Sequence, residues 1–191
     1  MPTPTPPSEA GAVYTRTAVT LHWLIAALIV AALVLGLTMT GMHMSVLKIK
    51  LFAYHKWIGL TVLALVLVRL LWRATHRPPP EVPMPRWQEL AATAAHWLLY
   101  VLMIVVPLTG WTYSSATGYS VVYLKLWRVP DLVHKNEQLA ATLVKVHHIL
   151  AWTLLVVIVL HVLAALKHHF MDRDATLRRM LAWRGSRALS P

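Results

Sequence analysis

Histidines in apolar surroundings are the residues of this 191-residue sequence whose type and spacing could do chemistry. An ionisable side chain inside a membrane span is costly, so it indicates a functional site, and imidazole is the commonest metal ligand in proteins. Four of the 11 histidines are expected to be solvated residues in loops or past a helix end: His43, His76, His134 and His169. The other seven fall in or at the ends of long apolar stretches: His22, His55, His96, His147, His148, His161 and His168.

The spacing of His147 and His161 is the first indication of what these histidines bind. Fourteen residues of helix span about 21 Å and leave the two side chains within about 40° of one face. His148 points about 100° away from that face, whereas His168 continues it at the membrane surface. Two imidazoles on one face, one near each surface of a bilayer core about 30 Å thick, suit two ligands stacked across a membrane.

Four apolar segments must position these side chains. Hydrophobic residues make up 58% of the chain and charged residues 13%, and a bilayer core needs about 20 apolar residues of helix. The sequence predicts an all-α membrane protein, a four-transmembrane-helix bundle with its ligands held between the helices. The predicted helices are Ala18–Met39, Leu51–Trp72, Leu90–Tyr113 and Ala140–Leu166. Pro107 lies inside the third helix, where a transmembrane helix tolerates it with a kink.

Composition also excludes several classes of protein. The absence of cysteine excludes disulfides, thiolate metal sites, iron–sulfur clusters and covalent c-type haem. The net charge of +11 does not indicate nucleic-acid binding, because the charges are kept out of the apolar stretches and form no basic face. The first span is not expected to be a cleaved signal peptide, because it is too long, has only Arg16 before it and lacks an A-x-A-like site.

Charge asymmetry predicts the orientation. Eleven of the 18 Lys and Arg residues lie on the side that holds both termini, which favours an N-in, C-in arrangement. Only Asp131 and Glu137 offset the positive charge of the outer side, which is either ordinary solvated surface or a surface that attracts anions. The outer basic residues are Lys48, Lys50, Lys56, Lys125, Arg128, Lys135 and Lys145.

The remaining segments are connections around a transmembrane domain of residues 17–180. Residues 1–16 are predicted to be a disordered tail and residues 181–191 a basic tail. Residues 77–86 are expected to form an extended inner loop, because they are rich in proline. The longest outer loop, residues 114–139, has enough Trp and Tyr to lie at the membrane interface.

Alternating helix directions pair the histidines by depth. His22 starts the first span on the inner side, at the level of His161, and His55 starts the second on the outer side, at the level of His147. The predicted pairs are therefore His22 with His161 and His55 with His147. His96, early in the third span, also lies at the inner level and is an alternative ligand there.

Each of the four paired histidines is followed four residues later by a small residue, which leaves room for a planar macrocycle beside the helix and supports the same pairing. His96 instead has the bulky Tyr100 four residues on. Arg69 lies at the inner level on the helix face that carries His55, where it could pair with a haem propionate. Hydrogen bonding between helices and binding of zinc are the alternatives, although zinc usually needs further close ligands and the spans contain no carboxylate. The small residues four positions after the paired histidines are Ala26, Gly59, Ala151 and Ala165.

The sequence resembles the bacterial cytochrome b561 family from Thr17 to Met180. The motifs that carry the resemblance are LHWLIAALIV at the first span, HKWIGL and VRLLWR in the second, and VHHILAW and LHVLAALKHHFMDRD in the fourth. The resemblance implies a four-helix inner-membrane cytochrome with two non-covalent b-type haems, each bound by two histidines. It also implies oxidation of superoxide at the periplasmic face and electron transfer to ubiquinone. The family's haem-ligand pattern falls on His22, His55, His147 and His161.

These expectations assign roles at both ends of the bundle. Residues expected to attract superoxide, with Lys56 and Lys145 alternatively holding haem propionates, are Lys48, Lys50, Lys56 and Lys145. Residues expected near the inner haem and a quinone are Arg69, Arg73, His96 and His168. Two other functions stay open: an electron-transfer subunit that anchors a dehydrogenase or hydrogenase, and a transporter or structural bundle that uses histidines without haem.

Overall fold

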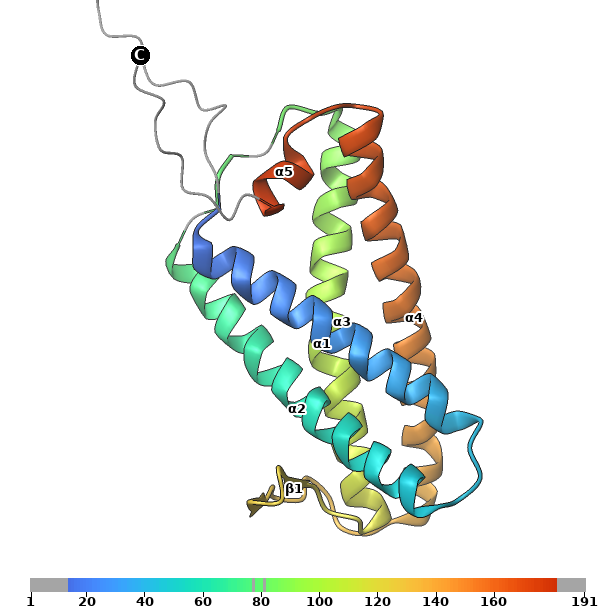
Figure 1. Cartoon of the computed structure of the whole chain (residues 1–191). Helices are drawn as coiled ribbons and strands as arrows, with labels where there is room; N and C mark the ends of the chain where they lie inside the picture. The colour runs from blue at the N-terminus through green and yellow to red at the C-terminus, as the bar shows by residue number, and fades with distance from the viewer. Residues whose placement is uncertain (1–13, 77, 81, 182–191) are drawn as a thin grey trace, which may run out of the picture.

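Four long helices cross one another in the computed structural model, which describes residues 14–76, 78–80 and 82–181 (Figure 1). All four are long and apolar enough to span a membrane, which confirms the predicted all-α, four-transmembrane-helix bundle. The predicted tails, 1–16 and 181–191, lie outside the described residues except for 14–16 and 181. The long helices are α1 (Arg16–Thr40), α2 (Val46–Thr75), α3 (Arg86–Thr117) and α4 (Glu137–Phe170).

Each helix contains its predicted span and extends beyond it. Side-chain caps explain three of the starts: the side chains of Thr15, Ser45 and Asn136 each accept a hydrogen bond from a backbone N–H three residues on. Because Ser45 caps α2, that helix begins five residues before the predicted boundary. Lys48 and Lys50 therefore lie in its first turns, within the helix.

The helices pack as two neighbouring pairs, α1 with α2 and α3 with α4, and α2 also packs on α3. The connections define two ends: the end of the α1–α2 and α3–α4 connections is called the hairpin end here, and the opposite one the tail end (Figure 1). A small apolar core joins the pairs and lies between the two ends. It consists of Ile25, Ile29, Val62, Val66, Leu102, Leu154 and Val157.

Two short elements were not expected from the sequence. The α3–α4 connection contains a hairpin of strands β1 (Val122–Tyr123) and β2 (Trp127–Arg128). At the tail end, helix α5 (Thr176–Leu181) folds back onto the bundle, where the indole N–H of Trp23 donates to the carbonyl of Met180 at 2.8 Å.

One histidine expectation was wrong. His169 lies in the last turn of α4 with its Nδ1 atom buried, so it is neither past the helix end nor freely solvated.

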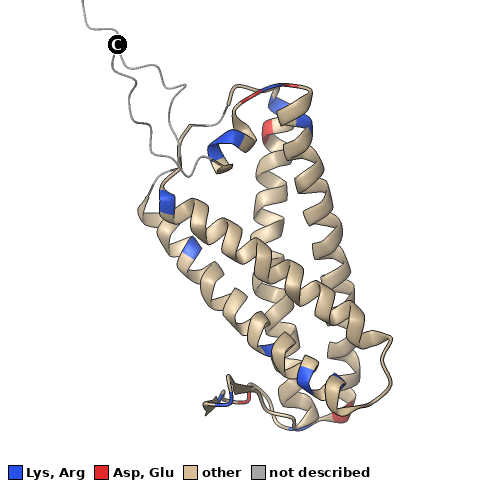
Figure 2. Ribbon diagram, in the orientation of Figure 1, with Lys and Arg blue, Asp and Glu red and all other residues tan. Residues whose placement is uncertain are grey.

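Charged residues gather toward the two ends of the bundle, and the helices between them carry few (Figure 2). Both ends contain Lys or Arg, in agreement with the basic residues predicted on the outer as well as on the inner side. The N-in, C-in orientation remains a prediction.

Candidate cofactor site between the helices

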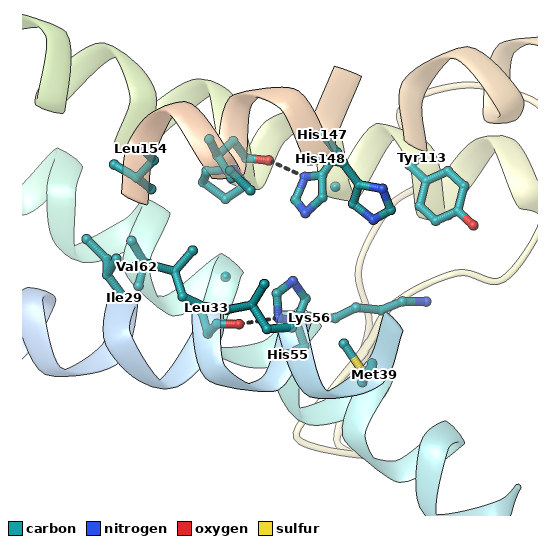
Figure 3. A pocket seen from close by; sticks show the side chains of 18 of the residues that line it. Ile29, Leu33, Met39, His55, Lys56, Val62, Tyr113, His147, His148 and Leu154 are labelled. Carbon is teal, nitrogen blue, oxygen red and sulfur yellow. Dashed lines mark hydrogen bonds between the residues drawn. The ribbon is translucent and has the colours of Figure 1, made fainter. Parts of the chain in front are cut away.

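Two histidines from different helix pairs face each other near the hairpin end. The ring centres of His55, on α2, and His147, on α4, are 6.1 Å apart with their planes at 85° (Figure 3). Both line a largely apolar cavity of about 560 Å³ to which all four long helices contribute. That volume falls within the range of about 300–1,000 Å³ that is usual for cofactor pockets.

Neighbouring helices fix the rings of both histidines. Nδ1 of His55 lies 2.9 Å from the carbonyl oxygen of Ala32 on α1, and Nδ1 of His147 lies 3.1 Å from that of Val106 on α3. A carbonyl only accepts hydrogen bonds, so Nδ1 must carry the proton in each ring. Nε2 of each ring therefore keeps its lone pair, the tautomer that metal-bound histidines commonly adopt.

A glycine on the neighbouring helix makes room for each imidazole. A Cβ atom added to Gly36 would lie 3.4 Å from Cε1 of His55, and one added to Gly110 would lie 3.1 Å from Cε1 of His147. Each glycine follows by four residues the carbonyl that its histidine contacts, so the same arrangement occurs in both helix pairs. Sequence reasoning missed these two glycines, although each lies in the partner helix at the depth of a candidate ligand.

The arrangement fits a metal held between two imidazoles. With a metal–nitrogen bond of about 2 Å on each side, the centres of two such rings lie about 6 Å apart. The two small residues predicted beside these histidines, Gly59 and Ala151, both line the cavity and leave space for a planar group. His148 also lines the cavity, but its side chain is exposed and it faces no second ligand on another helix.

Three histidines meet toward the tail end. The ring centres of His22 and His161 are 6.4 Å apart, so the structure brings the second predicted pair together. His96 is closer still to His161, at 5.5 Å between ring centres. The separation of His22 and His161 is nearer to that of His55 and His147.

The two arginines predicted near the inner site line a separate cavity of about 270 Å³ at the tail end. Arg69 donates from Nη1 to the carbonyl of Ala18 at 2.8 Å and from Nε to the hydroxyl of Tyr100 at 3.1 Å. Arg73 lines the same cavity and has an exposed side chain. Tyr100 therefore orients Arg69 instead of only obstructing the space beside His96.

The four predicted lysines fall into two groups. Lys48 and Lys56 line the large cavity, where Lys48 donates to the carbonyl of Met42 at 2.6 Å and Lys56 to the hydroxyl of Ser114 at 2.7 Å. Lys50 and Lys145 are exposed at the hairpin end. Only the second pair presents its charge fully to the solvent.

His168 lies in a cluster of charged side chains at the tail end. Its Nδ1 is 2.7 Å from Oδ2 of Asp174 and 3.1 Å from Oδ2 of Asp172, which also accepts from Lys167 at 2.6 Å. Partial burial raises the pKa of Asp174, but hydrogen bonds from the backbone N–H of Thr176 and from His168 outweigh it, so the pKa lies below its usual value. Asp174 is therefore ionised at neutral pH and can orient His168.

Comparisons with known proteins agree on one relationship. The family model described as prokaryotic cytochrome b561 matches residues 13–183. Cytochrome b561 homolog 2 of Escherichia coli (strain K12) is 34% identical over 164 residues, covering 84% of this chain and 86% of that protein. A protein of Yersinia pestis named probable superoxide oxidase CybB is 31% identical over 179 residues, covering 88% and 95%.

Proposed function

The chain belongs to the prokaryotic cytochrome b561 family, and from that premise we propose that it oxidises superoxide at one membrane face and reduces ubiquinone at the other. Membership makes it a multi-pass bacterial membrane protein that transfers electrons and binds b-type haem. The proposal adds that there are two haems, that the membrane is the inner one and that the hairpin end faces the periplasm. The name of the Yersinia relative supports the choice of electron donor.

The observation that carries the proposal is the facing pair His55 and His147, each with Nδ1 on a backbone carbonyl. These two residues would hold one haem, and His22 and His161 would hold the other. When bound between two imidazoles, a b-type haem supplies one-electron transfer and has no free position for oxygen on the iron. The protein's part is to keep the Nε2 lone pairs facing each other and to surround the cavity with apolar side chains that exclude water.

The direct test is spectroscopic and kinetic. The purified protein should contain two non-covalent haems per chain, and superoxide should drive quinol formation by the protein in detergent. Two superoxide anions each lose one electron and leave as dioxygen, while one quinone takes up two electrons and two protons. Absence of haem would contradict the whole proposal, whereas haem without superoxide-driven quinol formation would contradict only the choice of reaction.

The hairpin end is proposed to attract superoxide by charge. Lys50 and Lys145 are exposed there, and an excess of positive charge raises both the local concentration of a small anion and its association rate. Lys48 and Lys56 lie deeper, on the cavity that holds His55, where a cation could also pair with a haem propionate. The exposed Lys50 and Lys145 are therefore proposed to attract superoxide, and the cavity residues Lys48 and Lys56 to pair with a haem propionate.

Neutralising Lys50 and Lys145 together with glutamine should slow reduction by superoxide roughly threefold to tenfold at low ionic strength. The reason is long-range attraction, which added salt screens with a Debye length of about 10 Å at 0.1 M. Stopped-flow rates measured against salt concentration test this, with Arg86→Gln at the tail end as the matched control. A parent rate that is independent of salt and equal to that of the double variant would contradict steering and favour a partner protein as the donor.

The tail end is proposed to bind the quinone. A quinone carbonyl accepts hydrogen bonds, and its reduction takes up protons, so a titratable imidazole near the haem suits both needs. His168 is the proposed proton donor, and the carboxylate of Asp174 holds its Nδ1 at 2.7 Å. Arg73 and His96 are proposed as neighbours of the quinone, and Arg69 is proposed to pair with a propionate of the haem nearer the tail end. The cavity that Arg69 and Arg73 line does not include His168.

Replacing His168 by alanine should leave both haems in place and lower quinone-dependent turnover by about 100-fold, the usual effect of removing a general acid. Asp174→Asn should lower turnover less and alter its pH profile, because the imidazole loses its charged partner. In the parent, the ionised Asp174 also stabilises the folded protein. This contribution to the free energy of unfolding is complete above the unfolded pKa of Asp174 of about 3.9 and is lost as pH falls through its lower folded pKa. His134→Ala, at the hairpin end, is the control. Unchanged turnover in His168→Ala would remove His168 from the quinone site.

A further inference from the structure

The hairpin of β1 and β2 has an unusual turn. Its strands pair Tyr123 with Trp127, and the backbone N–H of Leu126 donates to the carbonyl of Tyr123 at 2.9 Å. The two turn residues between them, Leu124 and Lys125, both have positive φ, at 49° and 62°. Tight turns of this kind favour asparagine and glycine, so leucine at such a position is not explained by turn chemistry.

The hairpin is tied to the side of α2 by two side-chain hydrogen bonds. The indole N–H of Trp57 donates to the carbonyl of Val122 at 2.7 Å, and the hydroxyls of Thr61 and Tyr123 are 2.7 Å apart. Trp57 and Thr61 are about 16 and 22 Å along the helix from its first residue. The hairpin therefore lies beside the half of α2 that is nearer the hairpin end, the lower half in Figure 1.

The side chains that the hairpin leaves uncovered are mostly apolar. Leu126 is 76% exposed and Trp127 59% exposed, and Leu124 and Val122 are exposed beside them. On the side of α2 that the hairpin contacts, the exposed Val68 lies seven residues beyond Thr61 and within about 20° of the same helix face. An apolar surface of this kind is unfavourable in water, and its position beside an exposed apolar face of a membrane-spanning helix indicates what covers it.

We propose that the hairpin inserts into the bilayer leaflet at the hairpin end. Leu124, Leu126 and Trp127 lie among the lipid chains near the headgroups, where tryptophan is enriched in membrane proteins. Lys125, which is exposed, extends toward lipid phosphates, as long basic side chains do at membrane interfaces, whereas Arg128 pairs with Asp131 at 2.8 Å. The occupant of this surface is thus phospholipid, and not a second copy of the chain or a soluble partner.

Insertion would also hold in place the segment just before the hairpin, whose Val121 lines the large cavity. Lys56, which lines that cavity, donates to the carbonyl of Tyr119 at 3.3 Å, three residues before the hairpin begins. A hairpin fixed in the leaflet therefore keeps the Tyr119 carbonyl beside Lys56. This inference about lipid contact does not depend on which electron donor the protein uses.

The absence of cysteine allows a direct test in the haem-loaded, full-length protein. Leu126→Cys, labelled with the environment-sensitive dye NBD, is placed in nanodiscs of phosphatidylethanolamine and phosphatidylglycerol, with and without lipids that carry a doxyl quencher. We expect blue-shifted emission that doxyl lipids quench strongly and aqueous iodide hardly affects. His134→Cys, exposed on the same connection, is the water control, and Val156→Cys, exposed near the middle of α4, is the lipid control.

Two results would overturn the proposal. Emission from Leu126→Cys that matches His134→Cys would place the hairpin in water, and blue-shifted emission that doxyl lipids do not quench would indicate contact with protein. Leu124→Cys serves as a second site if Leu126→Cys does not retain the parent haem spectrum. Lys125→Cys should be quenched best by a headgroup-linked quencher, because its side chain is directed to the membrane surface.

Discussion

Replacing His147 by alanine is expected to reduce the haem content to about half of that of the parent protein, because one of the two proposed bis-histidine haems loses a ligand. His55→Ala should have the same effect, since the two rings face each other at 6.1 Å across one cavity. The remaining haem, proposed on His22 and His161, lies about 21 Å further along α4 and should keep its spectrum.

Haem stoichiometry by the pyridine haemochrome method, with redox titration of the remaining haem, measures this loss. Gly110→Val gives a second route to the same site, because even its Cβ would lie 3.1 Å from Cε1 of His147. Displacing the ring should weaken haem binding by about 10- to 100-fold, the usual effect of disturbing a ligand's surroundings. Gly41→Val is the control, because a Cβ at Gly41 meets nothing within 4 Å. Full haem content in His147→Ala would contradict the assignment.

Much of this arrangement could be predicted from the sequence because helices in a membrane are nearly regular. Fixed rise and alternating direction bring His55 to the depth of His147 and His22 to that of His161, and the structure places both pairs of rings within 6.5 Å. The histidine–carbonyl contacts and the opposing Gly36 and Gly110 could not be predicted, because they depend on the rotation of neighbouring helices about their axes. Depth follows from counting residues, whereas rotation follows from packing.

The short elements were missed for a different reason. Helix α5 and the hairpin are held by tertiary hydrogen bonds, among them those from Trp23 to Met180 and from Trp57 to Val122, that have no periodic signal. The sequence of the hairpin turn even argues against it, since Leu124 and Lys125 both adopt positive φ. Local propensity therefore failed where the surroundings, and not the segment itself, determine the conformation.

The three histidines at the tail end lead to the second large expected effect. His161→Ala should remove the haem nearer the tail end and reduce superoxide-driven quinone reduction to the background rate. The haem on His55 and His147 should still accept an electron from superoxide, because it lies at the opposite end of the bundle. Rapid-scan absorption would then show a fast first reduction that is not followed by quinol formation.

His22 and His96 distinguish the two possible partners of His161. Both rings are close to it, at 6.4 and 5.5 Å between centres, and both separations are near the spacing of about 6 Å for two imidazoles on one metal, so distance alone does not select the partner. His22 has Ala26 four residues on, whereas the corresponding Tyr100 beside His96 is engaged with Arg69. We therefore expect His22→Ala to reproduce the loss seen in His161→Ala.

His96→Ala should keep both haems and affect only the rate of quinone reduction, if His96 lies beside the quinone as proposed. Magnetic circular dichroism in the near infrared separates the cases, because loss of an axial histidine changes the charge-transfer bands of the ferric haem. Loss of the haem in His96→Ala with retention in His22→Ala would reverse the pairing. The ligand set would then be His96 with His161, on α3 and α4, and the haem would lie within one helix pair instead of joining the two.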